Sequence, residues 1–454
     1  MRPISVEELL AAVHGELLRG ELTQTITSVE TDSRAARAQM LFVPLVAARD
    51  GHDFMDQALL GGAEGTLCSR TPEQYLDGKF YIRVADTRLA LKALASWYRD
   101  QFEIPYIQIT GSVGKTTTKE MIASVLAEHF CTLKTDGNFN NDIGVPKTLF
   151  RLAPEHEVAV IETGMNHFDE ISYLGEMVRP DIAVISNVGD AHIENLGSRA
   201  GILKAKCEIF DNLKKTGFAV LNGDDALLNT VQPDVPVYRC GESESCNVRV
   251  AEVEELGIDG IRCCVTTEQQ IYRLTIPAPG RHMIYSAAMA ALIGEKLGLS
   301  ADEITAGISH YEPAGERMRL IRKDGGMLIL SDCYNANPQS MAAAIHTLGQ
   351  TEQSYKVAVL GDMGELGPIS EQAHFDMGAC CGKESIDLLI AVGEKSKAMV
   401  DGAAGKVDAI HWAADLEEAK DLIDRLVQDD AAVLVKASHA MHFEKLVAHL
   451  QERA

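Results

Sequence analysis

The residues with the clearest chemical potential lie at 110–118, where the sequence reads Thr-Gly-Ser-Val-Gly-Lys-Thr-Thr-Thr. This run follows an apolar segment of strand length and opens an amphipathic segment of helix length. Glycines in such a turn let backbone N–H groups surround phosphate oxygens, and the start of the following helix favours negative charge. Lys115 can bridge β- and γ-phosphates, and the Thr116 hydroxyl can ligate Mg²⁺. The sequence therefore predicts a phosphate-binding loop, although Ile109 stands where the longer form of the motif has its first glycine.

This loop needs a strand before it and a helix after it, and that alternation continues along the chain. After Pro105, short apolar runs alternate with helical patterns, which predicts a parallel sheet covered by helices on both faces. From about 235 to 277 the alternation becomes β-rich, and we interpret it as an antiparallel extension. The expected strands before this extension are 106–110, 158–161, 182–186 and 218–221, and the expected helices are 115–130, 169–178 and 199–213.

A second series of strands and helices begins near residue 325, so the chain contains two successive α/β sheets. With roughly 150 residues per domain, 454 residues predict about three domains. We expect an α/β protein with a small mixed domain at 1–102, a central domain at 103–313 and a C-terminal domain at 314–454. The expected elements of the last domain are strands 327–330, 356–360, 388–392 and 432–435, with helices near 338–348, 370–380, 395–401, 415–427 and 441–450.

Charge and composition exclude several classes of protein. Lys plus Arg is 42 and Asp plus Glu is 66, a formal net charge of −24, which argues against a nucleic-acid partner. No apolar stretch approaches the ~18 to 20 residues that span a bilayer, so we expect no membrane insertion. Ten cysteines without a CxxC pair favour reduced thiols in a cytoplasmic protein over a zinc site or a disulfide scaffold.

Seven segments, in order, resemble one family. They are TGSVGKTTTKE (110–120), GNFNNDIGVP (137–146), ETGMNHFDEI (162–171), NVGDAH (187–192), AKCEIF (205–210), DCYNANPQSM (332–341) and GDMGELG (361–367). Together they are similar to the Mur ligases, the ATP-dependent amide-forming enzymes of peptidoglycan precursor synthesis. The resemblance covers essentially the whole chain. It implies a UDP-substrate domain, a central P-loop domain for ATP and Mg²⁺, and a C-terminal Rossmann-like domain on the ATP and amine side.

Within the family, the segment 332–338, Asp-Cys-Tyr-Asn-Ala-Asn-Pro, is similar to the branch that adds a dipeptide. The resemblance then implies that ATP phosphorylates the free carboxylate of UDP-N-acetylmuramoyl-tripeptide. The amine of D-Ala-D-Ala attacks the acyl phosphate, so catalysis depends on positioning and charge neutralisation. We expect a monomer.

The resemblance also implies two Mg²⁺ ions. Thr116 and Glu162 are the expected ligands of the first ion, and Glu162 follows a predicted strand at the end where α/β sheets bind ligands. His192 is the expected ligand of the second ion, with a structural histidine as the alternative.

Lys206 matches the family's lysine that reacts with CO₂ to form a metal-ligating carbamate, although Cys207 stands where a small residue is usual. Lys204 is two residues away and would lie on another face of a helix. The alternative is a solvated lysine.

The resemblance assigns further residues to the ligands. The expected catalytic residues are Lys115, Asn141, Glu162, His192 and Lys206. The expected ATP contacts are Gly111, Ser112, Val113, Gly114, Lys115, Thr116, Thr117, His282, Ser286, Arg317 and Asp332. The expected substrate contacts are Ser33, Arg34, Asn138, Asn141, Asn166, His167, Asn335 and Asn337.

Three segments depart from the family pattern. Met283 and Ser286 replace two asparagines near the adenine, Val46 to Arg49 replaces a Lys-Gly-Glu element, and His439 replaces an arginine. These departures keep an inactive nucleotide-binding paralogue as an alternative.

Features of the sequence oppose three other functions. The 335–338 segment argues against a sister ligase that adds lysine or diaminopimelate. The uridine-type N-terminal domain argues against a folylpolyglutamate synthase. The lack of an Asn-Lys-x-Asp motif argues against a switch GTPase.

Since sites from three domains must converge, the connectors near 100–105 and 311–315 are expected to be hinges.

Overall fold

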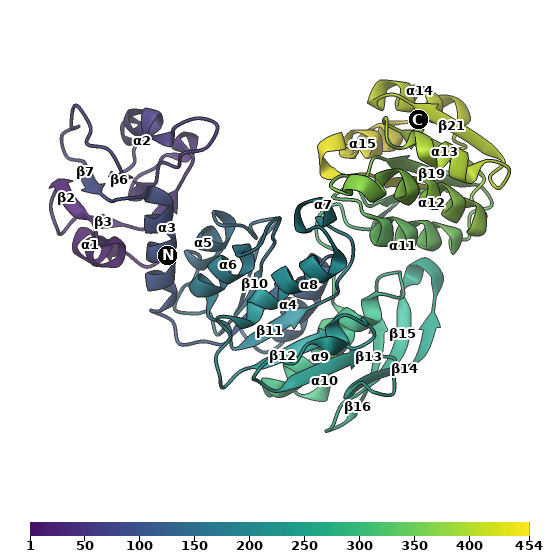
Figure 1. Ribbon diagram of the computed structural model, residues 1–454, viewed down its shortest axis with the longest axis horizontal. Helices are drawn as coiled ribbons and strands as arrows, with labels where there is room; N and C mark the ends of the chain where they lie inside the picture. The colour runs from purple at the N-terminus through teal and green to yellow at the C-terminus, as the bar shows by residue number, and fades with distance from the viewer. Residues whose placement is uncertain (454) are drawn as a thin grey trace.

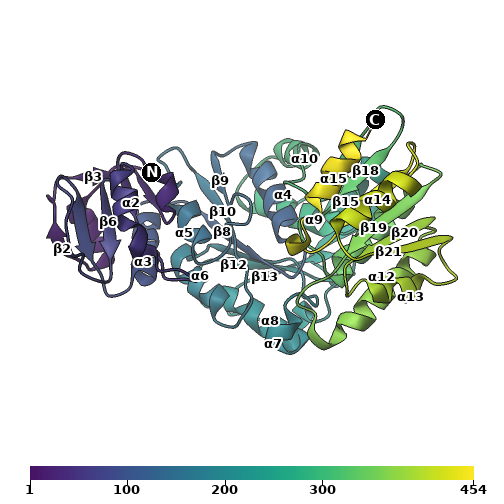
Figure 2. The same ribbon diagram turned by 90° about the horizontal axis from the view of Figure 1, so that it is seen from above.

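The computed structural model describes residues 1–453, and its three main sheets follow one another along the long axis of the molecule (Figures 1 and 2). Their strands lie within residues 16–83, 106–276 and 319–436. Each sheet therefore falls inside one of the three predicted domains, whose boundaries stay predictions. The predicted α/β class is confirmed.

The N-terminal part is a mixed five-stranded sheet in the order β2-β7-β6-β5-β4, with a separate β1–β3 pair. The apolar run from Met40 to Val46 has the length of a strand, but the strand ends at Phe42, close to Pro44, which has no N–H for a sheet ladder. The elements are β1 (Ile4–Ser5), α1 (Val6–Val13), β2 (Glu16–Arg19), β3 (Thr25–Ile26), β4 (Ser28–Glu30), β5 (Met40–Phe42), α2 (Met55–Leu60), β6 (Gly65–Cys68), β7 (Phe80–Arg83) and α3 (Thr87–Arg99).

The central part is a nine-stranded sheet in the order β16-β15-β14-β13-β12-β11-β8-β10-β9. The pairs from β9 to β14 are parallel, and β14, β15 and β16 pair antiparallel, which is the predicted extension. Its strands are β8 (Tyr106–Thr110), β9 (Thr132–Lys134), β10 (Val158–Glu162), β11 (Ile182–Ile185), β12 (Phe218–Asn222), β13 (Val237–Gly241), β14 (Val248–Glu255), β15 (Ile261–Thr266) and β16 (Ile271–Ile276). Its helices are α4 (Lys115–Ala127), α5 (Gly144–Leu149), α6 (Glu170–Val178), α7 (Ile193–Leu196), α8 (Arg199–Cys207), α9 (Met283–Lys296) and α10 (Ala301–Ser309).

The C-terminal part is a six-stranded sheet in the order β17-β18-β22-β19-β20-β21, parallel except for β17. The sequence patterns missed β17 and β21, because edge strands are less buried and their apolar pattern is weaker. The elements are β17 (Arg319–Arg322), β18 (Leu328–Ser331), α11 (Pro338–Gly349), β19 (Lys356–Gly361), α12 (Ser370–Lys383), β20 (Leu388–Val392), α13 (Lys397–Ala403), β21 (Ala409–Ala413), α14 (Leu416–Leu426), β22 (Ala432–Lys436) and α15 (Glu444–Glu452).

Strand register brings three strand ends of the central sheet to one edge. Ile109 of β8 lies opposite Glu162 of β10, and Thr110 lies opposite Ile185 of β11. The loops that follow these strands therefore start side by side. This edge is where α/β sheets bind ligands.

The N-terminal and central parts share one hydrophobic core. Leu94 and Tyr98 of α3 belong to the same buried cluster as Leu149 of α5 and Met177 of α6. The C-terminal sheet has its own buried clusters on its two faces.

Two absences apply to residues 1–453. No helix in this range is long and apolar enough to cross a membrane. All ten cysteines are free thiols there, and seven of them are buried.

Candidate functional site

The predicted phosphate-binding loop joins β8 to α4 at the carboxyl edge of the central sheet. Gly114 has φ of +77°, a left-handed conformation in which a side chain would be strained. A Cβ added to Gly111 would lie 1.9 Å from Ser186 Oγ. Lys115 Nζ donates to the Gly111 carbonyl at 2.8 Å, so the side chain curls back over the loop. Burial lowers the pKa of Lys115.

Residues at the end of β11 hold this loop in place. Asn187 Oδ1 accepts from the Val113 N–H at 2.9 Å, and Asn187 Nδ2 donates to the Val113 carbonyl at 2.9 Å. Ser186 Oγ donates to the same carbonyl at 2.6 Å, and the Ser112 N–H donates to the Asn187 carbonyl at 3.1 Å. The loop shape is thus fixed by the neighbouring strand.

Thr116 and Glu162 lie together, as the predicted metal site requires. Thr116 Oγ1 donates to Glu162 Oε2 at 2.7 Å, and both residues are buried. The other carboxylate oxygen, Oε1, accepts from Asn140 Nδ2 at 2.8 Å. The backbone N–H of Glu162 donates to Thr135 Oγ1 at 3.0 Å.

The Thr116–Glu162 pair fits a hard cation. Glu162 is only 1% exposed, and none of the ion pairs within 4.0 Å among residues 1–453 involves its carboxylate. A buried carboxylate without a cationic partner is costly, and Mg²⁺ prefers oxygen ligands. No group of three His, Cys, Asp or Glu side chains suited to a metal occurs in that part of the chain. The pair therefore suits a cation that takes its remaining ligands from phosphates.

Lys206 points inward from α8, whereas Lys204 is exposed. Lys206 is only 1% exposed, and Lys204 Nζ lies 5.3 Å from the centre of the Phe168 ring. No hydrogen bond or ion pair of the Lys206 amine occurs within residues 1–453. Burial, followed by the charge of Lys115, holds the pKa of Lys206 well below its usual value. The Lys206 amine therefore gives up its proton more readily than an exposed lysine amine does.

His192 directly precedes α7 and contacts the C-terminal part. Its Nδ1 lies 2.5 Å from Oε2 of Glu365, which follows β19. Hydrogen bonding from His192 lowers the pKa of Glu365. The assignment of His192 as a metal ligand stays a prediction, and any ion there would compete with Glu365.

Arg317 and Asp332 lie on the C-terminal side of the loop. The Arg317 guanidinium stacks 3.8 Å from the centre of the Tyr334 ring, and its charge is among those that lower the pKa of Lys115. Asp332 Oδ2 lies 2.5 Å from Nζ of the buried Lys436, and Oδ1 accepts from the Met318 N–H at 3.1 Å. Asp332 is therefore already paired.

Several predicted ligand contacts have structural partners. The Asn141 carboxamide accepts from the Gly144 N–H at 2.8 Å at the start of α5. Asn337 caps α11 in a reciprocal pair with Ser340. Ser286 Oγ lies 2.9 Å from Thr118 Oγ1, joining α9 to α4. These contacts occupy the side chains, and their ligand roles stay predictions.

Thr117 lies in the first turn of α4. The other predicted contacts fall into two groups. Asn138, Asn166, His167, His282 and Asn335 are exposed. Ser33 and Arg34 belong to the N-terminal part, far along the molecule from the loop (Figure 1). Ser33 Oγ donates to Gln57 Oε1 at 3.1 Å, and Arg34 pairs with Asp32 at 2.7 Å.

The structure places Asn140, Asn187 and Lys436 in the site. The sequence predicted no role for Asn187 and Lys436, and it assigned the loop of Asn138, Asn140 and Asn141 to the muramoyl substrate with Asn141 favoured for direct contact. Asn140 and Asn187 lie inside quoted motifs, but no spacing rule separates a loop asparagine that binds from one that only turns. Lys436 could have been suspected as a lysine that ends an apolar strand.

Comparisons with known proteins agree with this geometry. The family model of the Mur ligase middle domain matches residues 109–294, and that of the Mur ligase glutamate ligase domain matches residues 316–439. The UDP-N-acetylmuramoyl-tripeptide–D-alanyl-D-alanine ligase of Escherichia coli is 38% identical over 100% of this chain and 99% of its own length.

Solved structures are similar over the same length. MurF from Acinetobacter baumannii superposes with a TM-score of 0.92 at 34% identity, covering 100% of both chains. MurF ligase from Thermotoga maritima, determined in complex with ADP, has a TM-score of 0.82 at 25% identity over 94% of this chain and 97% of its own.

Proposed function

The chain belongs to the Mur ligase family, and from this premise we propose that it joins D-Ala-D-Ala to UDP-N-acetylmuramoyl-tripeptide at the expense of ATP. The observation that carries the proposal is the full-length match to ligases named for this reaction, over the N-terminal part as well as the two family domains. A match confined to the central domain would have left the substrate open.

The residues of the phosphate-binding loop support the first step. The γ-phosphoryl group moves to the substrate carboxylate, and ADP leaves. Backbone N–H groups at the start of α4 and the Lys115 ammonium offset the negative charge that gathers there. Arg317 adds a second cation from the C-terminal side.

Thr116 and Glu162 would hold Mg²⁺. When bound, the ion neutralises phosphate charge. His192 is the proposed ligand of a second ion. The loop that carries Asn138 and Asn141 is proposed to face the muramoyl substrate, with Asn166 and His167 near it.

In the second step, the amine nitrogen of D-Ala-D-Ala forms a bond to the acyl carbon, loses a proton, and phosphate leaves. Asn335 and Asn337 are proposed to lie on this side. His282 and Asp332 are proposed for the adenosine end of ATP, and Ser33 and Arg34 for the UDP end of the other substrate.

We further propose that Lys206 carries a carbamate. The neutral amine would form a bond to the carbon of CO₂ and release one proton, giving an anion near the phosphate loop. The buried position of Lys206 and its lowered pKa support this, since a neutral amine is the nucleophile required. Action as a monomer in the cytoplasm stays a prediction.

The test is release of ADP and phosphate by the full chain. We expect release only when UDP-N-acetylmuramoyl-tripeptide, D-Ala-D-Ala and ATP are all present. Turnover with a single amino acid and the dipeptide precursor would instead assign the sister reaction. No turnover with either pair would favour the inactive paralogue.

A further inference from the structure

Three asparagines occupy the loop between β9 and α5, and their side chains differ in what they contact. Asn138 is exposed. The carboxamide oxygen of Asn141 accepts from the N–H groups of Ile143 and Gly144 at the start of α5. Only Asn140 donates to Glu162, at 2.8 Å from Oε1.

The two oxygens of Glu162 therefore have different partners. Oε2 accepts from Thr116 Oγ1 at 2.7 Å, and Oε1 accepts from the Asn140 amide. With one oxygen held by the amide, the carboxylate plane cannot rotate freely. The oxygen shared with Thr116 then keeps its direction.

Asn140 is itself held on the end of β10. Its carbonyl accepts from the Gly164 N–H at 2.8 Å, two residues beyond Glu162. A Cβ added to Gly164 would lie 3.2 Å from the Asn140 carboxamide atoms, so the glycine leaves the room that the amide occupies. The amide is thus packed against the end of β10.

The other end of the loop is fixed to the same strand. Lys119 is buried on α4, and its Nζ donates to the Thr135 carbonyl at 2.5 Å. The Thr135 hydroxyl accepts from the Glu162 N–H at 3.0 Å, and the Thr135 N–H donates to the Val160 carbonyl at 3.1 Å. Thr135 and Asn140, at the two ends of the 135–140 segment, therefore both form hydrogen bonds to the chain around Glu162.

We propose that Asn140 is a positioning residue, which orients the Glu162 carboxylate for the divalent cation that accompanies the nucleotide. Groups that hydrogen-bond a metal-ligating carboxylate fix its orientation, and their loss typically weakens metal binding ten- to a hundredfold. The inference rests on the proposed function, because it concerns the cation of that reaction.

The experiment measures Mn²⁺ binding by electron paramagnetic resonance, using the full chain with a non-hydrolysable ATP analogue. We expect Asn140→Ala to weaken Mn²⁺ binding at least tenfold and to lower kcat, with the KM for D-Ala-D-Ala unchanged. Asn140→Ser, whose shorter side chain cannot reach Oε1, should behave alike and serves if the alanine variant fails to fold.

Asn138→Ala and Asn141→Ala are the matched controls from the same loop. Asn138→Ala should leave Mn²⁺ affinity unchanged, and Asn141→Ala should lower thermal stability while leaving Mn²⁺ affinity within twofold of the unmodified protein. The proposal is overturned if both Asn140 variants bind Mn²⁺ normally, or if Asn141→Ala weakens binding as much as they do. The proposed function is tested separately by the unmodified protein. If the unmodified protein ligates, the proposed function stands whatever the Asn140 variants do. If it does not ligate, the proposed function itself is overturned.

Discussion

At the scale of single residues, Lys206 is a group in the site whose charged form is costly to bury. It is a buried lysine amine beside a second cation, Lys115, and burial holds its pKa well below the usual value. Such a group costs stability unless it is neutral or becomes an anion that a metal can bind. Both the formation of such an anion and the cost in stability can be measured.

Lys206→Ala should reduce ligation at least a hundredfold, because the variant cannot form the carbamate. In ¹³CO₂-equilibrated buffer, the unmodified protein should show a carbamate carbon signal that the variant lacks. Lys204→Ala, on the exposed face of the same helix, should keep both signal and activity. Near-normal ligation by Lys206→Ala would refute the carbamate.

Lys206→Met should stabilise the protein in CO₂-free buffer, and more so at low pH. Because the folded pKa lies below the unfolded one, the unfolded chain holds the extra proton between the two values. Stability of the unmodified protein then rises with pH in that window, by up to about 1.4 kcal/mol per pH unit. Urea unfolding from pH 6 to 10 should show the advantage of the variant shrinking. A pH-independent difference, as expected for Lys204→Met, would contradict this.

At the scale of elements, the site is built where strands end. The β8 end supplies the phosphate-binding loop, the β10 end supplies Glu162, and the β11 end supplies Asn187. These side chains come together only through parallel register. The shape of the phosphate-binding loop therefore depends on its hydrogen bonds to Asn187 after β11.

Asn187→Ala should weaken ADP binding, because two side-chain hydrogen bonds to Val113 are lost. At about 1 kcal/mol for each bond, the loss is ~2 kcal/mol, or roughly thirtyfold in Kd. Isothermal titration calorimetry with ADP and Mg²⁺ measures it. Asn195→Ala, exposed on α7, should change nothing, and an equal loss in both variants would point to a general effect.

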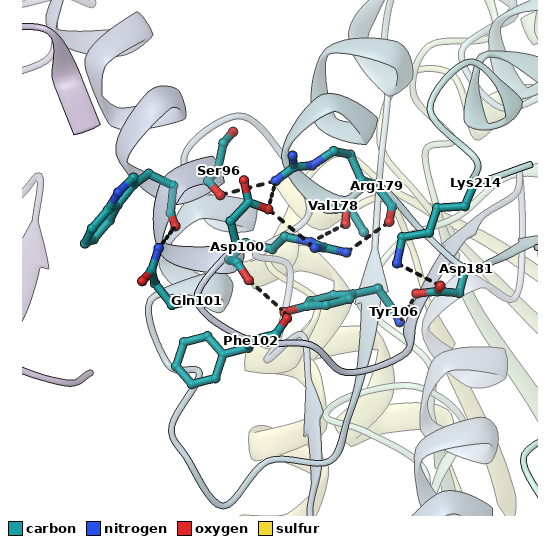
Figure 3. A network of polar contacts seen from close by, with 11 residues as sticks. Ser96, Asp100, Gln101, Phe102, Tyr106, Val178, Arg179, Asp181 and Lys214 are labelled. Carbon is teal, nitrogen blue, oxygen red and sulfur yellow. Dashed lines mark hydrogen bonds and ion pairs between the residues drawn. The ribbon is translucent and has the colours of Figure 1, made fainter. Parts of the chain in front are cut away.

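At the scale of the whole molecule, the two connectors differ. Arg99 at the end of α3 donates to the carbonyls of Val178 and Arg179 at 2.9 and 3.1 Å and lies 3.9 Å from the Tyr106 ring centre. Asp100 pairs with Arg179 in the same network (Figure 3). With the shared core, this network fastens the N-terminal part to the central part, so the structure does not favour the predicted hinge at 100–105.

The second connector, residues 311–315, is held by fewer contacts than the connector at 100–105. Gly315 has φ of +59° with no atom near its Cβ position, and Glu312 and Pro313 are exposed. The C-terminal part contacts the central part through polar pairs such as His192–Glu365 at 2.5 Å and Arg322–Asp259 at 3.8 Å. Polar pairs at the surface are weak and exchange readily with water.

We therefore expect closure about residues 311–315, since Arg317 and Met318 are already held by Tyr334 and Asp332 of the C-terminal part. Small-angle scattering should change on adding an ATP analogue and the muramoyl substrate. The change should fit a rotation of residues 316–453 against a fixed body of residues 1–310. Superimposable profiles, or a fit that needs movement at 100–105, would contradict this.

The sequence by itself determined the α/β class and the phosphate-binding loop, because these follow from periodicity and motif chemistry within short windows. Strands β8 and β10 were predicted within a residue of their ends for the same reason. The buried position of Lys206 was decided by the structure, since the sequence left a solvated lysine as the alternative. The tertiary structure alone decided which asparagine reaches Glu162, that Asn187 holds the loop and that Asp332 pairs with Lys436. These contacts join residues far apart in the chain, so they depend on strand order and register, which no local pattern encodes.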